Sequence, residues 1–237
     1  MTKPTLLLVP GLMCNDVSWG PLAHTLAPQA SCQVVSHGEA DSLVIMAQRI
    51  LQNAPPHFCI AGHSMGGRVA LEVCRLAPER VQRLALLGTG YRAIESGAAG
   101  EEETAKRQAL LDLASNQGLR AMALAWVQNM VAPSRLKDSA LIEQIVRMFE
   151  TKSNDIFARQ IKALLQRPDA SDVLKNISVP TLVMAGEFDG WANTAQHQQM
   201  ADLIPAHPSV QVIAGSGHMM MMEEPAAVAA HFSNWLK

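Results

Sequence analysis

The sequence predicts an α/β domain built on a doubly wound, mostly parallel sheet of about six strands. Short apolar runs alternate along the chain with longer stretches of helical periodicity, as in other α/β proteins. Most of these apolar runs are continuous and end in glycine, which is typical of parallel strands that are covered on both faces. The length of 237 residues is sufficient for one domain with a sizeable core.

The elements of this sheet can be placed in chain order. Six runs are expected to form strands: 5–11, 32–38, 57–64, 81–88, 180–186 and 210–217. Four stretches between or after them carry helical patterns: 42–53, 65–77, 194–203 and 224–236. Ligands of such sheets bind beyond the carboxyl ends of the strands. Residues that directly follow a strand are therefore the first candidates for a functional site.

One long interval, from Tyr91 to about Asn176, contains no convincing strand. Three apolar stripes at helical spacing occupy it: Leu119, Met122, Trp126 and Met130; Leu141, Ile145, Met148 and Phe149; Ile161, Leu164 and Leu165. We expect residues 91–176 to form an inserted helical cap, and residues 1–90 and 177–237 to form the core domain. The alternative is that these helices simply thicken the core.

Composition and charge exclude several classes of protein. Hydrophobic residues make up 49% of the chain and charged residues 17%, an ordinary globular balance. The formal net charge is -2 and no basic block stands out, so we expect no nucleic-acid partner. No segment approaches the roughly 20 apolar residues of a membrane helix, so no membrane partner is expected either. The acidic run 101–103 is interpreted as the solvated first turn of a helix.

The chain contains four cysteines, Cys14, Cys32, Cys59 and Cys74. Their spacing lacks the CxxC pairs of metal sites, and we expect reduced thiols in a cytoplasmic protein. The beginning of the chain combines a lysine, an apolar run and a cysteine, as a leader peptide does. That run covers only residues 5–10, and the bulky Met13 precedes Cys14, so a buried strand is the preferred interpretation.

The segment Gly62-His63-Ser64-Met65-Gly66 fits the pattern G-x-S-x-G between a predicted strand and a predicted helix. A serine in such a sharp turn has a strained backbone, so glycines two residues away relieve steric clashes. Its side chain then stands above the sheet, and the amide of Met65 points toward an oxyanion formed nearby. We therefore interpret Ser64 as a nucleophile rather than as part of a flexible loop.

A serine hydroxyl needs a base, and the base needs an acid that orients it. Among the eight histidines, His218 follows the last predicted strand, while Asp189 lies just past the preceding strand. Both therefore lie on the rim expected for Ser64, and the order Ser, Asp, His is the one this architecture uses. Ordinary surface residues are the alternative. His63 is expected to turn away from the serine into local hydrogen bonds, and the other six histidines carry no special signal.

These motifs resemble those of the α/β-hydrolase fold superfamily, among its small bacterial esterases, enol-lactonases and carbon–carbon bond hydrolases with a helical cap. The resemblance covers essentially the full chain. It rests on Pro10-Gly11 with Trp19, Gly62 to Gly67, Gly186 with Asp189, and Gly217-His218 with Glu223 and Pro225. The resemblance implies Ser64 as nucleophile, Asp189 as acid and His218 as base. It also implies an oxyanion hole made by the backbone amides of Leu12 and Met65.

Two features depart from the pattern of that superfamily. The chain has Pro10-Gly11 where the family usually has His-Gly, although the glycine that turns the next amide inward is kept. The first two strands of the family's eight-stranded sheet are missing, so a six-stranded core is expected. Serine at position 64 argues against the haloalkane dehalogenase and epoxide hydrolase branches, which the resemblance says use aspartate there.

The implied chemistry is acyl transfer through a covalent intermediate. We expect hydrolysis of a small to medium, largely apolar carboxylic ester, because few charges are expected to face inward from the cap. No metal or organic cofactor is expected, since the chain has no zinc-type ligand cluster and no G-x-G-x-x-G. A lactonase or a carbon–carbon bond hydrolase would use the same triad. A non-catalytic ligand-binding module is the alternative outside enzymes, although it has no need of an intact triad.

Four residues are candidates for substrate contacts: Trp126, Met130, Trp191 and Met219. Ordinary packing is the alternative for each of them. Methionine adapts to irregular apolar shapes, so most of the run Met219–Met222 is expected to fill the core, with Met219 next to the substrate.

Overall fold

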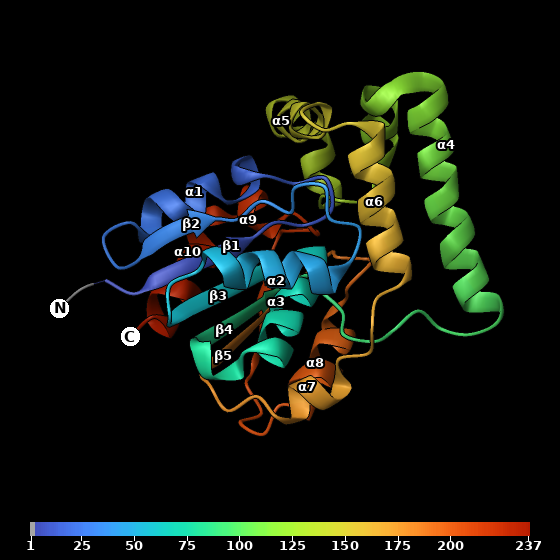
Figure 1. Ribbon diagram of the computed structural model, residues 1–237. Coiled ribbons are helices and arrows are strands. Elements are labelled where there is room, and N and C mark those ends of the chain that lie inside the picture. Colours follow the sequence, from blue (N-terminus) through green and yellow to red (C-terminus); the bar gives the residue numbers. More distant parts are fainter. Residues whose placement is uncertain (1–2) are drawn as a thin grey trace.

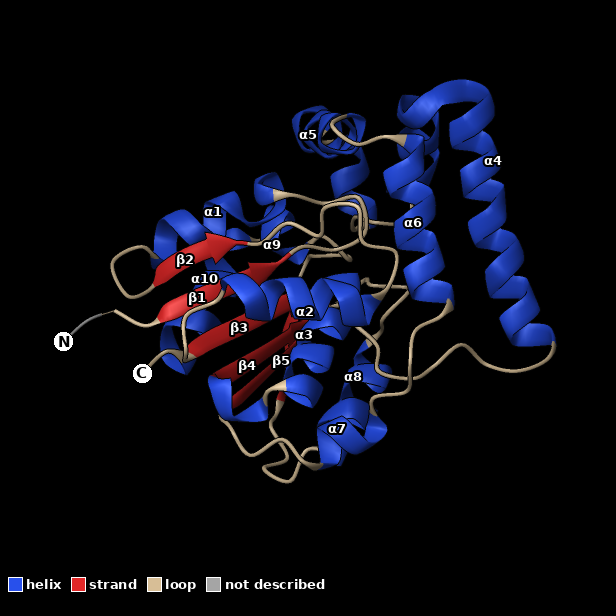
Figure 2. Ribbon diagram, in the orientation of Figure 1, coloured by secondary structure: helices blue, strands red, loops and turns tan. Residues whose placement is uncertain are grey.

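The computed structural model describes residues 3–237 and contains one sheet of six parallel strands in the order β2-β1-β3-β4-β5-β6. The strands are β1 (Thr5–Val9), β2 (Ser31–Val34), β3 (Phe58–His63), β4 (Val81–Leu87), β5 (Thr181–Gly186) and β6 (Val210–Ile213). Figure 2 shows the strands in the middle of the molecule with helices on both sides. The predicted doubly wound parallel sheet is confirmed.

The helices that cover the sheet are α1 (Asp16–Leu26), α2 (Leu43–Asn53), α3 (Met65–Leu76), α8 (Thr194–Leu203), α9 (Met220–Glu223) and α10 (Pro225–Trp235). Successive side chains of a strand point to opposite faces. On β1, Leu6 and Leu8 therefore join one apolar cluster with α1, α9 and α10. Leu7 and Val9 join the second cluster with α2 and α3, which lie on the near side in Figure 1. Burial on both faces explains why the strand sequences are continuously apolar.

Two parts of the helical layer differ from the sequence-based expectation. Helix α1 is not predicted, because Pro21 lies inside it and a proline usually ends a helix. It forms nevertheless, with the Asn15 side chain accepting a hydrogen bond from the amide of Val17 at 3.0 Å. The expected last helix, 224–236, forms as α10 with Pro225 in its first turn, whereas the short helix α9 before it is not predicted.

The chain between β4 and β5 forms helices: α4 (Ala98–Val127), the 3₁₀ helix η2 (Pro133–Lys137), α5 (Ser139–Glu150), α6 (Asn154–Leu165) and α7 (Ser171–Lys175). A further 3₁₀ helix, η1 (Pro78–Arg80), precedes β4. Helix α4 is interrupted at Gly118, whose φ of 88° lies outside the helical region. Figure 1 shows α4, α5 and α6 beside the carboxyl ends of the strands, whereas α7 lies near α8. We propose that residues 91–176 act as a cap on the core formed by 1–90 and 177–237.

The four cysteines are free thiols, of which Cys32 is half-buried and the other three are buried. Burial raises the pKa of Cys14 and of Cys74 to about 12. Within residues 3–237, none of the helices combines the length and the apolar character that crossing a membrane requires.

Candidate active site

Ser64 lies in a strained turn between β3 and α3. Its φ of 56° and ψ of -120° lie in a region that costs a residue with a side chain about 1–3 kcal/mol. Two contacts with the β4 side hold the turn: the Ser64 amide donates to the Leu87 carbonyl at 2.9 Å, and the Thr89 hydroxyl donates to the Ser64 carbonyl at 2.6 Å. The rest of the fold therefore imposes this conformation.

The glycines around Ser64 are required by close approaches of backbone. A Cβ at Gly62 would press on the backbone of Gly66, and a Cβ at Gly66 would press on the carbonyls of Val9 and Pro10. These are backbone atoms, which cannot move aside as the end of a side chain can. The predicted reason for the glycines is confirmed: they allow a tight turn that presents the serine.

The structure brings the three residues proposed as a triad into one chain of hydrogen bonds. The Ser64 Oγ lies 2.9 Å from Nε2 of His218, and Nδ1 of His218 lies 2.7 Å from Oδ2 of Asp189. His218 and Asp189 are buried, at 5% and 3% exposure, so water has little access to the contact between them. Because a carboxylate only accepts, the short contact places a proton on Nδ1 and leaves Nε2 to accept from the serine hydroxyl.

Asp189 is held as an acceptor by backbone amides. Its Oδ1 accepts from the amides of Trp191 and Ala192, both at 3.0 Å. Burial by itself would raise the pKa of Asp189, but the charge and hydrogen bond of His218 together with these two amides outweigh it and hold the pKa below its ordinary value. The carboxyl group is therefore ionised at neutral pH and keeps the His218 ring in one orientation.

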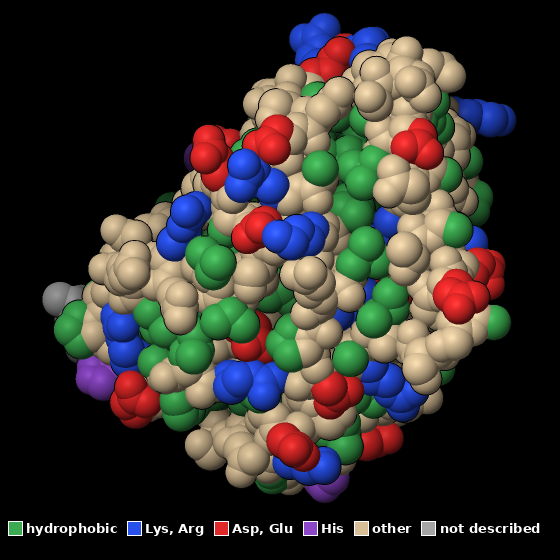
Figure 3. All heavy atoms as spheres, turned by 45° about the vertical axis from the view of Figure 1, so that its right-hand side comes forward, with side chains coloured by type: hydrophobic (Ala, Val, Ile, Leu, Met, Phe, Trp, Pro, Cys, Tyr) green, Lys and Arg blue, Asp and Glu red, His purple; other side chains and the backbone are tan. Residues whose placement is uncertain are grey.

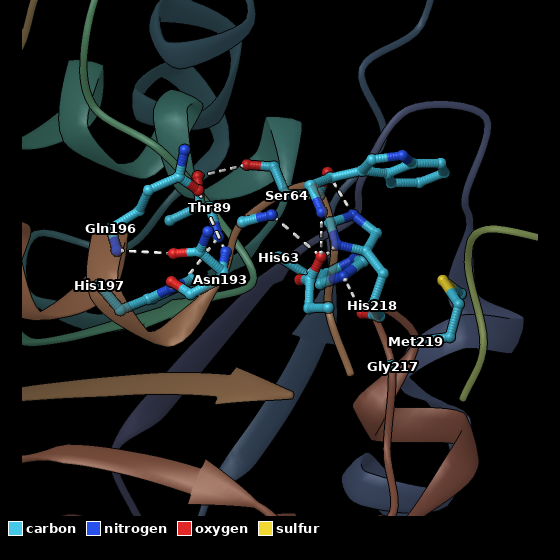
Figure 4. A network of polar contacts seen from close by, with 12 residues as sticks. His63, Ser64, Thr89, Asn193, Gln196, His197, Gly217, His218 and Met219 are labelled. Atoms are coloured by element: carbon cyan, nitrogen blue, oxygen red, sulfur yellow. Dashed lines mark hydrogen bonds and ion pairs between the residues drawn. The ribbon is translucent and has the colours of Figure 1, made fainter. Parts of the chain in front are cut away.

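His63 also contributes to the site, in a way that the sequence does not reveal. Its Nε2 donates to the backbone carbonyl of His218 at 2.8 Å, across 155 residues of sequence, instead of forming the expected local bonds. Burial, together with the neighbouring His218, lowers the pKa of His63 to about 3, so the ring is neutral. The ring centroids of His63 and His218 lie 4.7 Å apart. Figure 4 shows the two residues next to each other. His63 thus fixes the loop that carries His218.

The two residues expected to form an oxyanion hole, Leu12 and Met65, line a cavity that also contains Ser64. Neither of their backbone amides donates to a protein acceptor among residues 3–237. The loop before Leu12 is held by His37, whose Nε2 donates to the Pro10 carbonyl at 2.8 Å. Burial lowers the pKa of His37 to about 4, so this ring is neutral. No signal in the sequence marks His37, whereas the structure places it against the loop before Leu12.

The loop after Leu12 is held from the helical insertion. Met13 has a positive φ of 63°, and its amide donates to the side-chain oxygen of the buried Gln160 on α6 at 2.8 Å. This bond joins residues 147 positions apart and ties the loop of residues 10–13 to the proposed cap. Nothing in the pattern around Gln160 marks it beforehand, because a polar residue within an amphipathic helix is ordinary.

The loop that carries His218 rests on a buried carboxylate. Glu223 accepts hydrogen bonds from the amides of Gly217 at 3.0 Å, Met219 at 3.1 Å and Ala132 at 2.7 Å. Burial raises the pKa of this carboxyl group above its usual value, although the three amides work in the opposite direction. Glu223 thereby joins the His218 loop to the chain segment that follows α4.

A cavity of about 240 Å³ opens above Ser64. Trp126, Met130 and Trp191 line it, as expected, and Trp191 places its ring 5.0 Å from that of His218. Met219 lies elsewhere: it is fully buried, belongs to the core cluster, and is drawn apart from Ser64, beyond His218, in Figure 4. The backbone of Met219 binds Met130 and Glu223, which turns its side chain into the core.

Charged groups also line this cavity, which differs from the expected, largely uncharged lining. They are Arg68, Glu103, Lys106 and Arg107. Glu103 belongs to the run 101–103, which is therefore not fully solvated as expected. Its side chain turns toward the cavity because Arg107 and Arg167 bind it, at 2.7 Å each.

Comparison with known proteins places this geometry in a family. The family model described as "alpha/beta hydrolase fold" matches residues 28–225. The pimeloyl-[acyl-carrier protein] methyl ester esterase of Vibrio campbellii is 29% identical over 94% of this chain and 91% of that protein. The enzyme of the same name from Photobacterium profundum is 27% identical over 98% of this chain and 94% of its own length.

Solved structures share the fold over the whole chain. A thermophilic esterase from Thermogutta terrifontis superimposes with a TM-score of 0.85 and 24% identity, covering 99% of this chain and 90% of that one. The enol-lactonase from Burkholderia xenovorans LB400 gives a TM-score of 0.84 with 19% identity, covering 100% of this chain and 92% of that one. At these identities the superpositions establish the fold.

Proposed function

The chain belongs to the α/β-hydrolase fold family and is a carboxylic-ester hydrolase, and we propose that it cleaves a small to medium ester through an acyl-enzyme on Ser64. The chain of short hydrogen bonds from Ser64 through His218 to Asp189 carries this proposal. The free amides of Leu12 and Met65 support it, because an acyl-transfer site needs donors at the place where negative charge develops. A pure binding site has no need of both features.

The proposed reaction proceeds in two halves. Ser64 Oγ attacks the ester carbonyl while its proton moves to Nε2 of His218, and the amides of Leu12 and Met65 bind the oxyanion. His218 then gives that proton to the departing alkoxide, which leaves as the alcohol. In the second half His218 takes a proton from water, and the hydroxide attacks the acyl group. The proton returns to Ser64 as the carboxylic acid leaves.

The cavity supports a small substrate with an apolar part next to the scissile bond. Its volume is about 240 Å³, and Trp126 and Trp191 form part of the wall with ring centres 5.6 Å apart. The similar proteins from Vibrio and Photobacterium are named for a methyl ester. We therefore propose that the alcohol part is small and that the longer acyl part runs along these rings.

A series of p-nitrophenyl esters from acetate to octanoate tests the proposed function. We expect kcat/KM to be highest for a short or medium acyl chain. It should fall at octanoate, because a cavity of about 240 Å³ is too small for so long an acyl chain. A matched set of lactones and vinylogous diketones measures the two competing reactions, since a lactonase or a carbon–carbon hydrolase would prefer them. Turnover of those compounds without any release of p-nitrophenol would contradict the ester proposal.

Gln160→Met is expected to lower kcat by roughly tenfold to 100-fold with little change in KM. Methionine keeps the length of the side chain but cannot accept the Met13 amide, so the Leu12 amide loses its fixed direction. Complete loss of an oxyanion donor costs about 100- to 1,000-fold, which sets the upper bound. Steady-state kinetics on the best p-nitrophenyl ester measure the effect, with the exposed Gln166→Met as control. An unchanged kcat would show that Gln160 does not position this amide.

A further inference from the structure

Arg68 is a charged residue in the active-site cavity that the proposed mechanism does not use. It lies on α3 one turn beyond Ser64, is half-buried, and lines the same cavity. Its Nη1 donates to the backbone carbonyl of Arg92 at 2.8 Å. Within the described chain, no carboxylate lies within ion-pair distance of its guanidinium group. A guanidinium group that lines the cavity and has no counter-ion is available to bind an anionic part of a ligand.

The nearest carboxylate is already shared by two other arginines. Glu103 accepts from Arg107 at 2.7 Å through Oε1 and from Arg167 at 2.7 Å through both oxygens. Burial would raise the pKa of Glu103, but the hydrogen bonds from Arg167 and Arg107 overcome it and lower the pKa to about 2. One negative charge therefore faces two guanidinium groups, and Arg68 adds a third positive charge beside them. The group as a whole is cationic.

Arg68 remains charged in this surrounding. Burial, with the neighbouring charges of Arg167 and Arg107, lowers its pKa to about 9, which is still above neutral pH. A guanidinium group has five N–H donors in one plane. Because one of them binds the Arg92 carbonyl, the others can bind an anion, and a carboxylate matches their planar geometry best.

The position of Arg68 connects two hollows. It lines both the cavity above Ser64 and a neighbouring one of about 450 Å³. The charged residues that line this second hollow are Arg68, Arg92 and Arg167 together with Glu95 and Glu103, so positive charge is in excess there. On the face drawn in Figure 3, hydrophobic side chains gather in a furrow of the upper, helical part, with Lys and Arg atoms near its lower end. A ligand that reaches from Ser64 toward this second hollow thus passes from apolar walls to positive charge.

We propose that Arg68 binds a free carboxylate of the substrate, so that the preferred esters are half-esters of short dicarboxylic acids. The inference rests on the proposed ester hydrolysis at Ser64 and adds a substrate class to it. The ester end lies at Ser64, the methylene chain lies along the apolar wall, and the carboxylate pairs with the guanidinium group. The occupied site then contains the counter-ion that the protein itself does not supply to Arg68.

Matched methyl esters test this substrate class. Monomethyl succinate, glutarate, adipate and pimelate carry the carboxylate, and methyl esters of the monocarboxylic acids of equal carbon number do not. We expect the wild type to favour the half-ester over its neutral match by about 10- to 100-fold in kcat/KM, mainly through KM, at one or two chain lengths. Acid release is followed at constant pH and low salt. A preference for the neutral ester at every length would overturn the proposal.

Variants of Arg68 separate this role from a structural one. Arg68→Met should bring the ratio between half-ester and neutral ester close to one, whereas Arg68→Lys should keep part of it. The control is Arg147→Met, a change at an exposed residue of α5, which should leave the ratio as in the wild type. An unchanged ratio in Arg68→Met would overturn the proposal.

Inhibition of the wild type gives a second readout, which applies even where a variant does not fold. Adipate should inhibit p-nitrophenyl butyrate hydrolysis competitively and at least about tenfold more strongly than hexanoate, and salt should weaken it. Equal inhibition by the two acids would overturn the carboxylate site while leaving ester hydrolysis in place. Absence of hydrolysis of any ester would instead overturn the proposed function, and the two failures are thus distinct.

Discussion

Ser64→Ala is expected to lower kcat for ester hydrolysis by at least about 10⁴-fold, the largest effect of any single substitution in this chain. The change removes only the hydroxyl that lies 2.9 Å from His218, while the strained turn keeps its glycines and its backbone hydrogen bonds. Without that oxygen no acyl-enzyme can form. The oxyanion donors remain, so a small residual rate through direct attack by water should persist.

The measurement combines kinetics with covalent labelling. Wild type should form one phosphonate adduct on Ser64 with a fluorophosphonate probe, detected by mass spectrometry, and Ser64→Ala should form none. Ser209→Ala, at an exposed serine before β6, is the matched control and should behave as the wild type in both assays. A Ser64→Ala variant that retains more than about a hundredth of the activity would require a different nucleophile.

The fold and the meeting of Ser64, His218 and Asp189 could be predicted because each of their signals is local. A continuous apolar run that ends in glycine marks a buried parallel strand, and the ends of parallel strands share one rim. Ser64 directly follows β3, and Asp189 and His218 lie in the loops after β5 and β6, so placing the strands also places these residues near one another. The steric need for Gly62 and Gly66 is equally local, since it arises within one turn.

The supporting contacts could not be predicted, because they join segments that the sequence does not relate. The bond from Met13 to Gln160 depends on how α6 packs against the loop of residues 10–13. The periodicity of the sequence does not determine this packing. The bond from His63 to the His218 carbonyl likewise spans 155 positions. Helix α1 is missed for another reason: tertiary packing of Trp19 and Leu22 outweighs the penalty of Pro21, which local rules cannot weigh.

The charges of the cavity show the same limit. The sequence places Glu103 one turn from Arg107, which indicates an ordinary surface pair. It does not reveal that Arg167 reaches the same carboxylate and leaves Arg68 without a partner. The elements that a helix packs against decide whether its charged side chains point into water or toward a cavity. The expectation of an uncharged lining failed for this reason.

Asp189→Asn is expected to lower kcat by about 10⁴-fold while the fold remains intact. The amides of Trp191 and Ala192 both donate to Oδ1, so the oxygen of the asparagine must take that position. Its NH₂ group then faces Nδ1 of His218, where the carboxylate Oδ2 lies at 2.7 Å in the wild type. Nδ1 must become an acceptor, the proton moves to Nε2, and Nε2 can no longer take the proton of Ser64.

Asp189→Asn and Ser64→Ala should not act independently when they are combined. The exposed Asp202→Asn on α8 should leave kcat unchanged, and this control separates the effect of the tautomer from a general loss of charge. In the double variant Ser64→Ala with Asp189→Asn, kcat should equal that of Ser64→Ala alone, because an oriented base has no effect without a nucleophile. If the losses of kcat in the two single variants multiplied in the double variant, Asp189 would act by a route other than holding His218 toward Ser64.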